Sequence, residues 1–298
     1  MQEILRVLNK TFGNNCKLSS CKTITDSYKN TTYKLTCSDA REPLFLKVEK
    51  PFKIPRIQKF QIKKEVAGLT LCANAGIPVP QIISADEDWI LLEFIDKNLI
   101  ASEHSLSDDN RAQLGAEFED IFVRISSIGG ASYGDTFPGG VVGQHSSWSG
   151  ALSKMTELLY EDGLELGIFG NNEHIVAQAI AKALSQIVTN SPPALFHCDL
   201  FSQNIMGTRK NGTVHISHVI DFGMSMFAPL VYSQYITWKF TDFAVTPIDI
   251  CRKFGVTQEE LIAYDILRIE PLVLAKIFEF DEYDIFTEYQ QKCECYIK

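Results

Sequence analysis

The sequence predicts an α+β fold in two lobes, a small lobe built on an antiparallel sheet and a larger, mainly helical lobe. Its 298 residues are 45% hydrophobic, which is enough to fill two adjoining cores. Short apolar segments of strand composition occupy the first third of the chain, and segments with apolar residues at helical spacing follow it. We therefore expect one lobe over residues 1–96 and a second over residues 97–298.

Five segments of the first lobe are predicted to form the sheet. Apolar and β-branched residues bounded by turn residues indicate strands, and they do so at residues 21–25, 32–36, 44–48, 82–85 and 89–94. A helix around Glu65 should pack on this sheet, because apolar side chains recur on one face of that segment. These side chains are Ile62, Val66, Leu69 and Ala73.

The second lobe should begin with a helix that Ser107 caps. The apolar face of this helix is formed by Leu114, Phe118, Ile121, Phe122 and Ile125. A Gly- and Ser-rich loop follows from Gly129, and residues 209–212, Arg-Lys-Asn-Gly, indicate a hairpin turn between two strands.

Two short motifs in the second lobe carry the polar groups of a phosphoryl-transfer site. Residues 194–204 read A-L-F-H-C-D-L-F-S-Q-N, and residues 219–223 read V-I-D-F-G. Together they give the pattern H-x-D-x-x-x-x-N followed by D-F-G, and an apolar strand leads into each motif. Asp and Asn residues also cap ordinary turns between strands, but the presence of both motifs in this order favours a catalytic role.

The residue types suit the transfer of a γ-phosphate. This reaction needs charge neutralisation by a metal ion and an acceptor oxygen in line, but little covalent work by the protein. Asp199 can accept the proton of the attacking hydroxyl. Asn204 and Asp221 offer the amide and carboxylate oxygens that Mg²⁺ prefers. We expect His197 to brace the D-F-G backbone rather than to transfer a proton.

A lysine and a glutamate of the first lobe complete this constellation. Lys47 lies in the apolar strand L-F-L-K-V, and helical spacing places Glu65 near the buried face of its helix. We expect an ion pair in which Glu65 orients Lys47 toward the nucleotide phosphates. The alternatives are a solvated edge lysine and a surface glutamate beside Lys63 and Lys64.

The chain resembles the aminoglycoside phosphotransferase and choline-kinase branch of the protein-kinase-like fold. The resemblance extends almost from end to end and rests on T-D-S-Y-K-N-T-T-Y-K-L from Thr25, F-L-K-V from Phe45, E-V-A-G-L from Glu65, A-G-I-P-V-P from Ala75, W-I-L-L-E-F-I from Trp89, H-C-D-L-F-S-Q-N-I-M from His197 and V-I-D-F-G from Val219.

This resemblance implies a bilobal protein-kinase-like fold with an N-terminal nucleotide-binding lobe and a C-terminal catalytic and acceptor-binding lobe. It also implies ATP or GTP as phosphate donor, Mg²⁺ as cofactor and a small molecule as acceptor. The backbone of Glu93 and Ile95, in the hinge between the lobes, would pair with the adenine edge. An ordinary buried strand that leaves the sheet is the alternative interpretation of the hinge.

The chain departs from the family pattern in several places. The turn over residues 26–31, where a glycine-rich loop would cover the phosphates, contains no glycine. Its backbone therefore has less freedom to approach phosphates, so we expect the side chains of Ser27, Asn30 and Thr31 to share in phosphate binding. Cys198 stands where small-molecule kinases of this branch carry glycine. No acidic residue closely follows D-F-G to brace the catalytic loop, and no A-P-E segment is present to dock a polypeptide.

The acceptor is expected to be cationic, because acidic residues are concentrated near the C-terminus. Between residues 265 and 288, seven acidic residues stand against Arg268 and Lys276. In the resembling family, helices of this region line the acceptor site, so Asp265 and Glu270 become candidate partners of ammonium groups. The helices up to about residue 188 would form another wall of that site. A solvated acidic helix face is an equally good explanation of the charge run.

Composition excludes other classes of function. The net charge of −9 and the lack of a basic stripe argue against nucleic-acid binding. The eight cysteines form no C-x-x-C pair or zinc-ligand spacing, which indicates free thiols in a reducing compartment. The sequence has neither a signal-peptide core nor an apolar run near the ~20 residues of a membrane span, so we expect a cytoplasmic protein. The sequence leaves the oligomeric state undefined.

These expectations combine into one function, an ATP- and Mg²⁺-dependent phosphotransferase that acts on a hydroxyl of a small, cationic, aminoglycoside-like molecule. A metabolic kinase for choline, ethanolamine or a fructosamine would use the same motifs. A nucleotide-binding regulatory module without turnover is the alternative from another class, and the glycine-free phosphate turn keeps it open.

Overall fold

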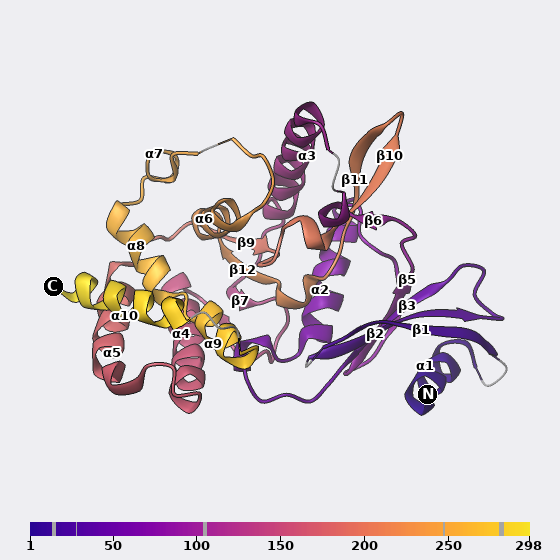
Figure 1. Cartoon of the computed structure of the whole chain (residues 1–298), viewed down its shortest axis with the longest axis horizontal. Helices are drawn as coiled ribbons and strands as arrows, with labels where there is room; N and C mark the ends of the chain where they lie inside the picture. Colours follow the sequence, from indigo (N-terminus) through magenta and orange to yellow (C-terminus); the bar gives the residue numbers. More distant parts are fainter. Residues whose placement is uncertain (14–15, 28, 104–105, 247, 280–282) are drawn as a thin grey trace.

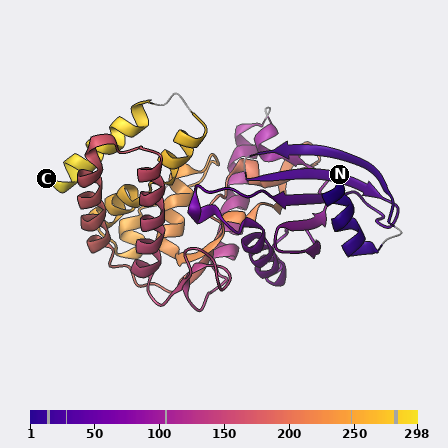
Figure 2. The ribbon, with the colours of Figure 1, turned by 90° about the horizontal axis from the view of Figure 1, so that it is seen from below.

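The computed structural model describes residues 1–13, 16–27, 29–103, 106–246, 248–279 and 283–298. The molecule is elongated, and the two ends of the chain lie far apart along its long axis (Figure 1). The strand-rich first part lies at one end and the C-terminal helices lie at the other, a division that Figure 2 shows again from below. The expected α+β arrangement in two lobes is therefore present.

Five antiparallel strands form the sheet of the first lobe, in the order β1-β2-β3-β5-β4. They are β1 (Leu18–Asp26), β2 (Asn30–Cys37), β3 (Leu44–Glu49), β4 (Ile82–Ala85) and β5 (Trp89–Glu93). Each of them overlaps the strand predicted for its region of the sequence. Strand β3 is the central strand, so Lys47 is flanked by Thr32 on one side and Ile90 on the other.

Helices cover both faces of this sheet, and each face has its own core. Side chains of a strand alternate between the two faces, so Leu91 packs in the same core as α1 (Gln2–Phe12), whereas Ile90 packs in the core of α2 (Gln61–Asn74). Helix α2 is the predicted helix around Glu65. Helix α1 was not predicted, although its buried residues recur at helical spacing, namely Ile4, Val7 and Leu8.

The second lobe is mainly helical. As predicted, Ser107 caps α3 (Asp108–Ser126), because its hydroxyl accepts a hydrogen bond from the Asn110 N–H at 3.2 Å. The remaining helices are α4 (Trp148–Glu165), α5 (Glu173–Gln186), α6 (Leu230–Phe240), α7 (Ile250–Phe254), α8 (Gln258–Leu267), α9 (Glu270–Ile277) and α10 (Tyr283–Ile297). Short 3-10 helices are η1 (Arg56–Gln58) in the first lobe and η2 (Ile100–Ser102), η3 (Gly170–Asn172), η4 (Ser202–Asn204) and η5 (Phe222–Met224) in the second.

Two small sheets of the second lobe bring the polar motifs together. Their orders are β11-β10-β6 and β8-β7-β12-β9. Strand β9 ends directly before His197, and β11 ends shortly before Asp221. The predicted hairpin turn joins β10 to β11, and Asn211 and Gly212 have φ angles of 50° and 85°, as a two-residue hairpin turn requires. The strands are β6 (Asn98–Leu99), β7 (Tyr133–Asp135), β8 (Gln144–His145), β9 (Pro193–Phe196), β10 (Ile205–Lys210), β11 (Thr213–Val219) and β12 (Met226–Pro229).

We propose the boundary between the lobes at residues 96 and 97. Strand β5 ends at Glu93 in the sheet of the first lobe, and β6 begins at Asn98 and pairs with β10 of the second. The few residues between these strands therefore join two separate sheets.

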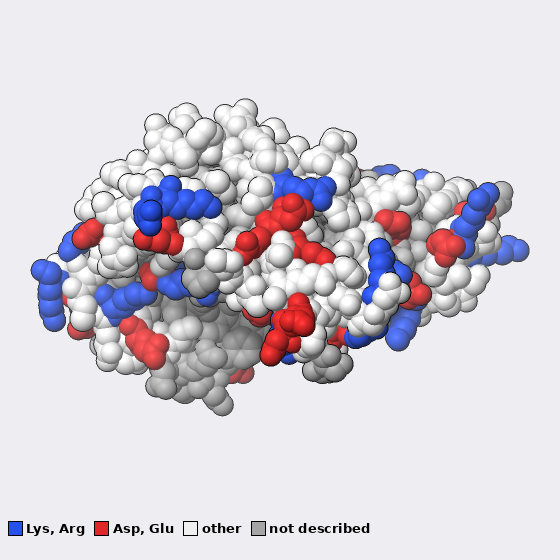
Figure 3. Space-filling model, turned by 90° about the horizontal axis from the view of Figure 1, so that it is seen from above, with Lys and Arg blue, Asp and Glu red and all other residues white. Residues whose placement is uncertain are grey.

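The surface carries charges of both signs. On the face drawn in Figure 3, Lys and Arg side chains are interspersed with Asp and Glu side chains, and acidic side chains gather near the middle of the molecule. Across the described residues, no helix has both the length and the apolar character that crossing a bilayer requires.

Candidate active site

Lys47 lies at the centre of a network of ion pairs. Its ammonium group donates to Glu65 Oε2 at 2.7 Å and to Asp221 Oδ1 at 2.8 Å. The side chains of Lys47 and Glu65 are only 5% and 3% exposed. Burial by itself would lower the pKa of Lys47, but the two carboxylates outweigh burial and raise this pKa above its ordinary value. The predicted pair of Lys47 with Glu65 is therefore confirmed, and Lys47 carries its charge.

Asp221 faces both this lysine and the open cleft. Its backbone has a φ of 62°, a left-handed conformation that Asp adopts more readily than most residues. Burial would raise the pKa of Asp221, but the adjacent ammonium of Lys47 reverses this effect and lowers the pKa to about 2. The side chain is 47% exposed. A permanently ionised carboxylate is thus held at the edge of the cleft.

Asp199 and Asn204 lie in contact on the loop after β9. The Asn204 amide Nδ2 donates to the backbone oxygen of Asp199 at 2.8 Å and to its carboxylate Oδ2 at 3.0 Å. Burial is the largest influence on Asp199 and, with the charge of Asp221, raises the pKa of this carboxyl above its usual range. A raised pKa improves a carboxylate as a proton acceptor.

His197 braces the backbone at this place, as predicted. Its Nε2 lies 3.0 Å from the backbone oxygen of Ile220, and its Nδ1 accepts a hydrogen bond from the Asp199 N–H at 3.3 Å. These contacts fit a neutral ring that carries its proton on Nε2. Burial lowers the pKa of His197 to about 4, which agrees with a neutral, structural imidazole.

A cavity of about 390 Å³ opens in front of these groups. Apolar side chains from both lobes line it, among them Phe45, Leu69, Leu92, Met206 and Ile220, and its charged and polar lining includes Lys47, Glu65, Asn204 and Asp221. The hinge residues Glu93 and Ile95 also line the cavity. The cavity thus offers the apolar and the charged surface that a nucleotide needs.

The turn over residues 26–31 uses its hydroxyl groups for its own structure. Ser27 Oγ donates to the Asn30 carbonyl at 3.1 Å and accepts from the Asn30 N–H at 3.2 Å. Thr31 Oγ1 donates to Asp26 Oδ1 at 2.7 Å. Of the three side chains expected to bind phosphate, only Asn30 lines the nucleotide cavity. Ser27 and Thr31 instead stabilise a turn that has no glycine.

Lys29 is a residue near the site to which the sequence analysis gave no role. It lies in the same turn, partly buried, and its backbone oxygen accepts from the Lys50 N–H at 2.7 Å. Burial lowers the pKa of Lys29, while the negative charges of Asp221, Glu270 and Asp199 raise it. The signal available in the sequence was the place of Lys29 in the turn that was expected to cover the phosphates.

A second, smaller cavity of about 70 Å³ lies on the other side of the catalytic loop. Cys198 lines this cavity and Asn204 lines the nucleotide cavity, so their loop borders both cavities, although Asp199 itself lines neither. Helix α4 contributes one wall of this cavity through Leu152, Met155 and Leu159. Charged residues at this cavity are Lys64, Asp135, Arg268 and Glu270.

The two acidic residues of the C-terminal helices that were expected to bind the acceptor, Glu270 and Asp265, have different surroundings. Glu270 lines the smaller cavity and accepts a hydrogen bond from Gln58 Nε2 at 2.6 Å. Asp265 does not line this cavity, because its carboxylate pairs with Lys239 and, at 3.2 Å, with Lys292. These lysines lower the pKa of Asp265 against the opposite effect of burial. Asp281 and Glu282 lie outside the described residues.

The residues present fit a magnesium ion that arrives with a nucleotide. Within the described ranges, no group of three or more His, Cys, Asp and Glu side chains could hold a metal ion alone. Asn204 turns its amide nitrogen to Asp199, which leaves its side-chain oxygen for another partner, and Asp221 uses only Oδ1 for Lys47. One or two protein oxygens combined with phosphate and water ligands are typical of Mg²⁺ sites.

Comparison with solved structures identifies the fold. A protein assigned as a fructosamine-3-kinase from Thermobifida fusca is 16% identical, with 99% of each chain covered and a TM-score of 0.64. A thermostable mutant of the aminoglycoside phosphotransferase APH(4)-Ia, in complex with AMP-PNP and hygromycin B, is 14% identical, with 99% of this chain and 98% of the other covered and a TM-score of 0.64. The streptomycin–ATP complex of APH(2'')-IIa is 16% identical, with coverage of 97% and 90% and a TM-score of 0.56.

At these identities the likeness concerns the fold, and the kinase-like α+β fold predicted from the sequence is confirmed. No curated protein matches the sequence. Residues 20–255, however, match the sequence pattern described as the phosphotransferase enzyme family. Because this match covers most of the chain, including Lys47, Glu65, Asp199, Asn204 and Asp221, the chain belongs to the phosphotransferase enzyme family.

Proposed function

We propose that this protein is a small-molecule kinase that transfers the γ-phosphate of ATP, or alternatively GTP, to a hydroxyl of a small acceptor. One observation carries the proposal: Lys47 joins Glu65 of α2 to Asp221 of the second lobe in the lining of the nucleotide cavity. Such a bridge presents one cation and one free carboxylate oxygen to the phosphates of a bound nucleotide.

The other groups follow from their places around this bridge. Asn204 and Asp221 would hold Mg²⁺, which supplies neutralisation of the phosphate charge when it is bound. Lys47 would bind phosphate oxygens, and Lys29 would place a second cation above them. Asp199 would orient the acceptor hydroxyl and accept its proton, because the loop holds it between the two cavities. Glu93 and Ile95 would contact the base from the hinge.

The acceptor is proposed to carry an amine near its reacting hydroxyl. The support is Glu270, a carboxylate at the cavity on the acceptor side of the Asp199 loop. We leave Asp265 out of this role, because two lysines neutralise it outside the cavity. The fold neighbours include aminoglycoside phosphotransferases bound to hygromycin B and streptomycin, and a protein assigned as a fructosamine-3-kinase. An aminoglycoside-like amine and a fructosamine are therefore the two acceptor classes to test first.

Choline and ethanolamine remain acceptors of the same chemical kind. A non-catalytic nucleotide-binding module is the alternative from another class. Such a module would not need Asp199 to be held in place as a catalytic base. The contact of Asn204 with the Asp199 carboxylate speaks for catalysis. We propose a cytoplasmic location, since that compartment supplies the nucleoside triphosphate.

An acceptor screen tests this function. We expect acceptor-dependent release of nucleoside diphosphate when the protein is incubated with Mg²⁺, ATP or GTP, and aminoglycosides, choline, ethanolamine or fructosamines. Asp199→Asn should abolish turnover and leave nucleotide binding intact, whereas Asp221→Ala should abolish Mg²⁺-dependent turnover. Tight nucleotide binding without turnover on any acceptor would favour the regulatory module instead.

A pair of matched variants tests the acceptor class. Glu270→Gln keeps the size of the side chain but removes its charge, so the acceptor KM should rise roughly tenfold while the nucleotide KM stays unchanged. Asp265→Asn removes a carboxylate of the same helical region outside the cavity and should leave the acceptor KM unchanged. Equal effects of the two variants, or a neutral sugar that reacts as well as an amine, would contradict an amine subsite at Glu270.

A further inference from the structure

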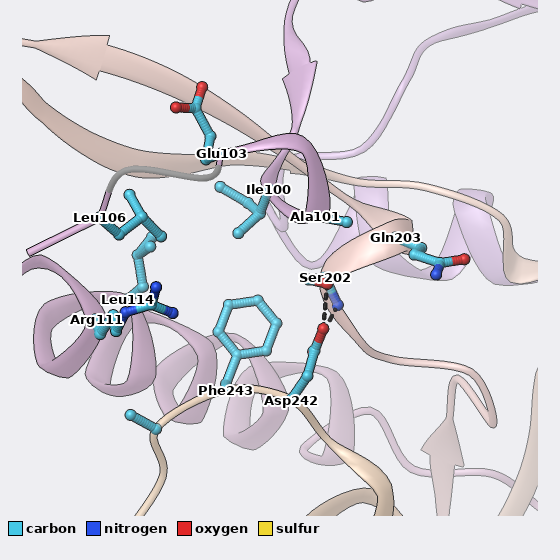
Figure 4. A pocket seen from close by; sticks show the side chains of 11 residues that line it. Ile100, Ala101, Glu103, Leu106, Arg111, Leu114, Ser202, Gln203, Asp242 and Phe243 are labelled. Atoms are coloured by element: carbon cyan, nitrogen blue, oxygen red, sulfur yellow. Dashed lines mark hydrogen bonds between the residues drawn. The ribbon is translucent and has the colours of Figure 1, made fainter. Parts of the chain in front are cut away.

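The loop that carries Asp199 and Asn204 is held by a carboxylate from a distant part of the chain. Asp242 Oδ1 accepts a hydrogen bond from the Ser202 backbone N–H at 3.0 Å, and Oδ2 accepts another from the Ser202 hydroxyl. Figure 4 shows the Asp242 side chain pointing at Ser202 with both bonds drawn. Ser202 is 7% exposed and begins η4, which ends at Asn204. Asp242 therefore restrains the catalytic loop at Ser202, between Asp199 and Asn204.

Asp242 belongs to a segment after α6, residues 241–246, which we call the strap. The strap is attached to α3 by an aromatic stack, because the rings of Phe243 and Phe118 lie 4.6 Å apart with an angle of 15° between their planes. It is also attached by a hydrogen bond of 2.8 Å from the Thr246 N–H to Glu119 Oε1. These contacts fix the strap on both sides of Ala244, and the first of them lies directly after Asp242.

Gly115 of α3 permits this close approach. A Cβ at this position would lie 1.8 Å from the carbonyl oxygen of Ala244, a distance that no side chain tolerates. The strap backbone therefore rests directly on the helix. The cavity beside this contact, of about 430 Å³, is lined by Asp242, Phe243 and Ala244 of the strap and by Arg111 and Leu114 of α3 (Figure 4).

The strap supplies an anchor that the D-F-G segment lacks. The chain has no acidic residue closely after D-F-G, where Ser225 and Ser233 make bonds to backbone oxygens of Lys64 and Pro229 instead. A carboxylate that accepts two hydrogen bonds restrains its partner strongly. Asn204 in turn donates to the Asp199 carboxylate, so a displacement of Ser202 would also displace Asn204 and Asp199. Small errors in the position of reacting groups lower the rate by large factors.

We propose that Asp242 is a positioning residue for phosphoryl transfer, which holds Ser202 and thereby keeps Asp199 and Asn204 in their reactive arrangement. Its effect on catalysis rests on the proposed function, whereas its effect on the loop does not. Neither Asp242 nor its hydrogen-bond partner Ser202 lines the nucleotide cavity, so its loss should change turnover and spare nucleotide binding.

Kinetic constants test this role. Asp242→Ala should lower kcat roughly tenfold to a hundredfold and change the nucleotide KM less than twofold. Asp242→Asn keeps one acceptor oxygen for the Ser202 N–H and should lose less activity. Asp109→Asn, an exposed aspartate in the first turn of α3, is the matched control and should behave as the unmodified protein. An Asp242→Ala enzyme with full kcat would overturn the proposal.

A variant that leaves Asp242 in place tests the strap. Gly115→Ala normally favours a helix, but here it should push Ala244 away and lower kcat as Asp242→Ala does. Combining the two changes should cause little further loss, because both release the same loop. A Gly115→Ala protein with normal kcat and a normal fold would show that the strap does not transmit this restraint.

Hydrogen–deuterium exchange separates this inference from the proposed function. In Asp242→Ala, the amides of residues 199–204 should exchange at least tenfold faster than in the unmodified protein and in Asp109→Asn. This measurement needs no acceptor. If the unmodified protein shows no turnover, the proposed function fails while exchange still decides whether Asp242 holds the loop, and unchanged exchange at Ser202 would overturn the inference.

Discussion

Cys198 shows how a single backbone angle constrains the catalytic loop. Its φ is 70°, in the left-handed region where a side chain costs about 1–2 kcal/mol relative to glycine. The resemblance to small-molecule kinases implies glycine at this position, and glycine adopts this angle without strain. Cys198 nevertheless stands here and lines the smaller cavity, so the chain accepts backbone strain at this position.

We expect Cys198→Gly to keep turnover within a fewfold of the unmodified protein, because glycine adopts this angle without strain. Cys198→Val should lower both kcat and the thermal midpoint of unfolding, because a branched side chain at positive φ is strongly disfavoured. Steady-state kinetics and thermal unfolding of the two variants provide the check. Equal activity of the Val and Gly variants would contradict the argument from φ.

His197 should make the stability of the protein sensitive to acid. It is 1% exposed, and burial lowers its pKa from 6.5 to about 4. Between these two values, the unfolded chain binds a proton that the folded protein excludes. The free energy of unfolding therefore falls as the pH falls from 6.5 to 4, by about 3 kcal/mol over the whole window, and this contribution is fully present above pH 6.5.

Urea unfolding at pH 7.5 and pH 4.5 measures this effect. The difference in unfolding free energy between the two pH values should be smaller in His197→Gln, because glutamine has no ring to protonate but can still donate to the Ile220 oxygen. His174→Gln, a change at an exposed histidine, should leave the difference unchanged. The same pH dependence in all three proteins would show that His197 is not the titrating group.

At the scale of elements, α2 is the part that links the two lobes of the site. It carries Glu65, and it rests on the D-F-G segment at Gly68, where a Cβ would lie 2.8 Å from Phe222 Cβ and 2.9 Å from Ser225 Oγ. The helix therefore cannot shift along this contact without moving Glu65 relative to Lys47. The close packing of Gly68 against Phe222 therefore helps to fix the position of Glu65 relative to Lys47.

Gly68→Ala should disturb this packing although it raises helix propensity by up to ~1 kcal/mol. We expect weaker nucleotide binding and a kcat lowered roughly tenfold, because α2 must move away from Phe222. Thr70→Ala changes an exposed residue of the same helix and serves as the control. Calorimetric titration with nucleotide and steady-state kinetics would reveal the difference, and normal values for Gly68→Ala would refute it.

At the scale of the whole molecule, the lobes are joined by more than the hinge. Arg56 of η1 pairs with Asp162 of α4, and its backbone N–H donates to the same carboxylate at 2.7 Å. The Asp162 side chain is fully buried, and burial raises its pKa despite the guanidinium group. Lys64 of α2 also reaches Asp135 of β7 at 3.0 Å. These pairs connect the first lobe to α4 and β7 of the second lobe.

Removal of one partner should therefore be costly. Arg56→Met leaves Asp162 buried without a cation and should lower the free energy of unfolding by about 3 kcal/mol. The double variant Arg56→Met with Asp162→Leu should recover most of this loss, because no buried charge then remains. Lys53→Met removes only an exposed pair with Glu165 and should cost less than ~1 kcal/mol. Additive losses in the double variant, measured by urea unfolding, would contradict this account.

The sequence by itself determined the strands of the first lobe, the cap of α3 and the hairpin turn. It also determined which polar groups line the nucleotide cavity, namely Lys47, Glu65, Asn204 and Asp221. These features depend on information within short segments, namely the spacing of apolar residues, turn residues and fixed motif intervals. The pairing of Lys47 with Glu65 also followed from such spacing, because a lysine inside an apolar strand needs a partner from the helix that covers it.

Only the tertiary structure decided how side chains in turns and on distant helices are used. Ser27 and Thr31 bond within their own turn, and Asp265 is neutralised by lysines from α6 and α10. Asp242 likewise meets Ser202 across 40 positions of the chain. Such contacts depend on how separate elements pack, and no local pattern of residues records the packing of elements that are far apart in sequence.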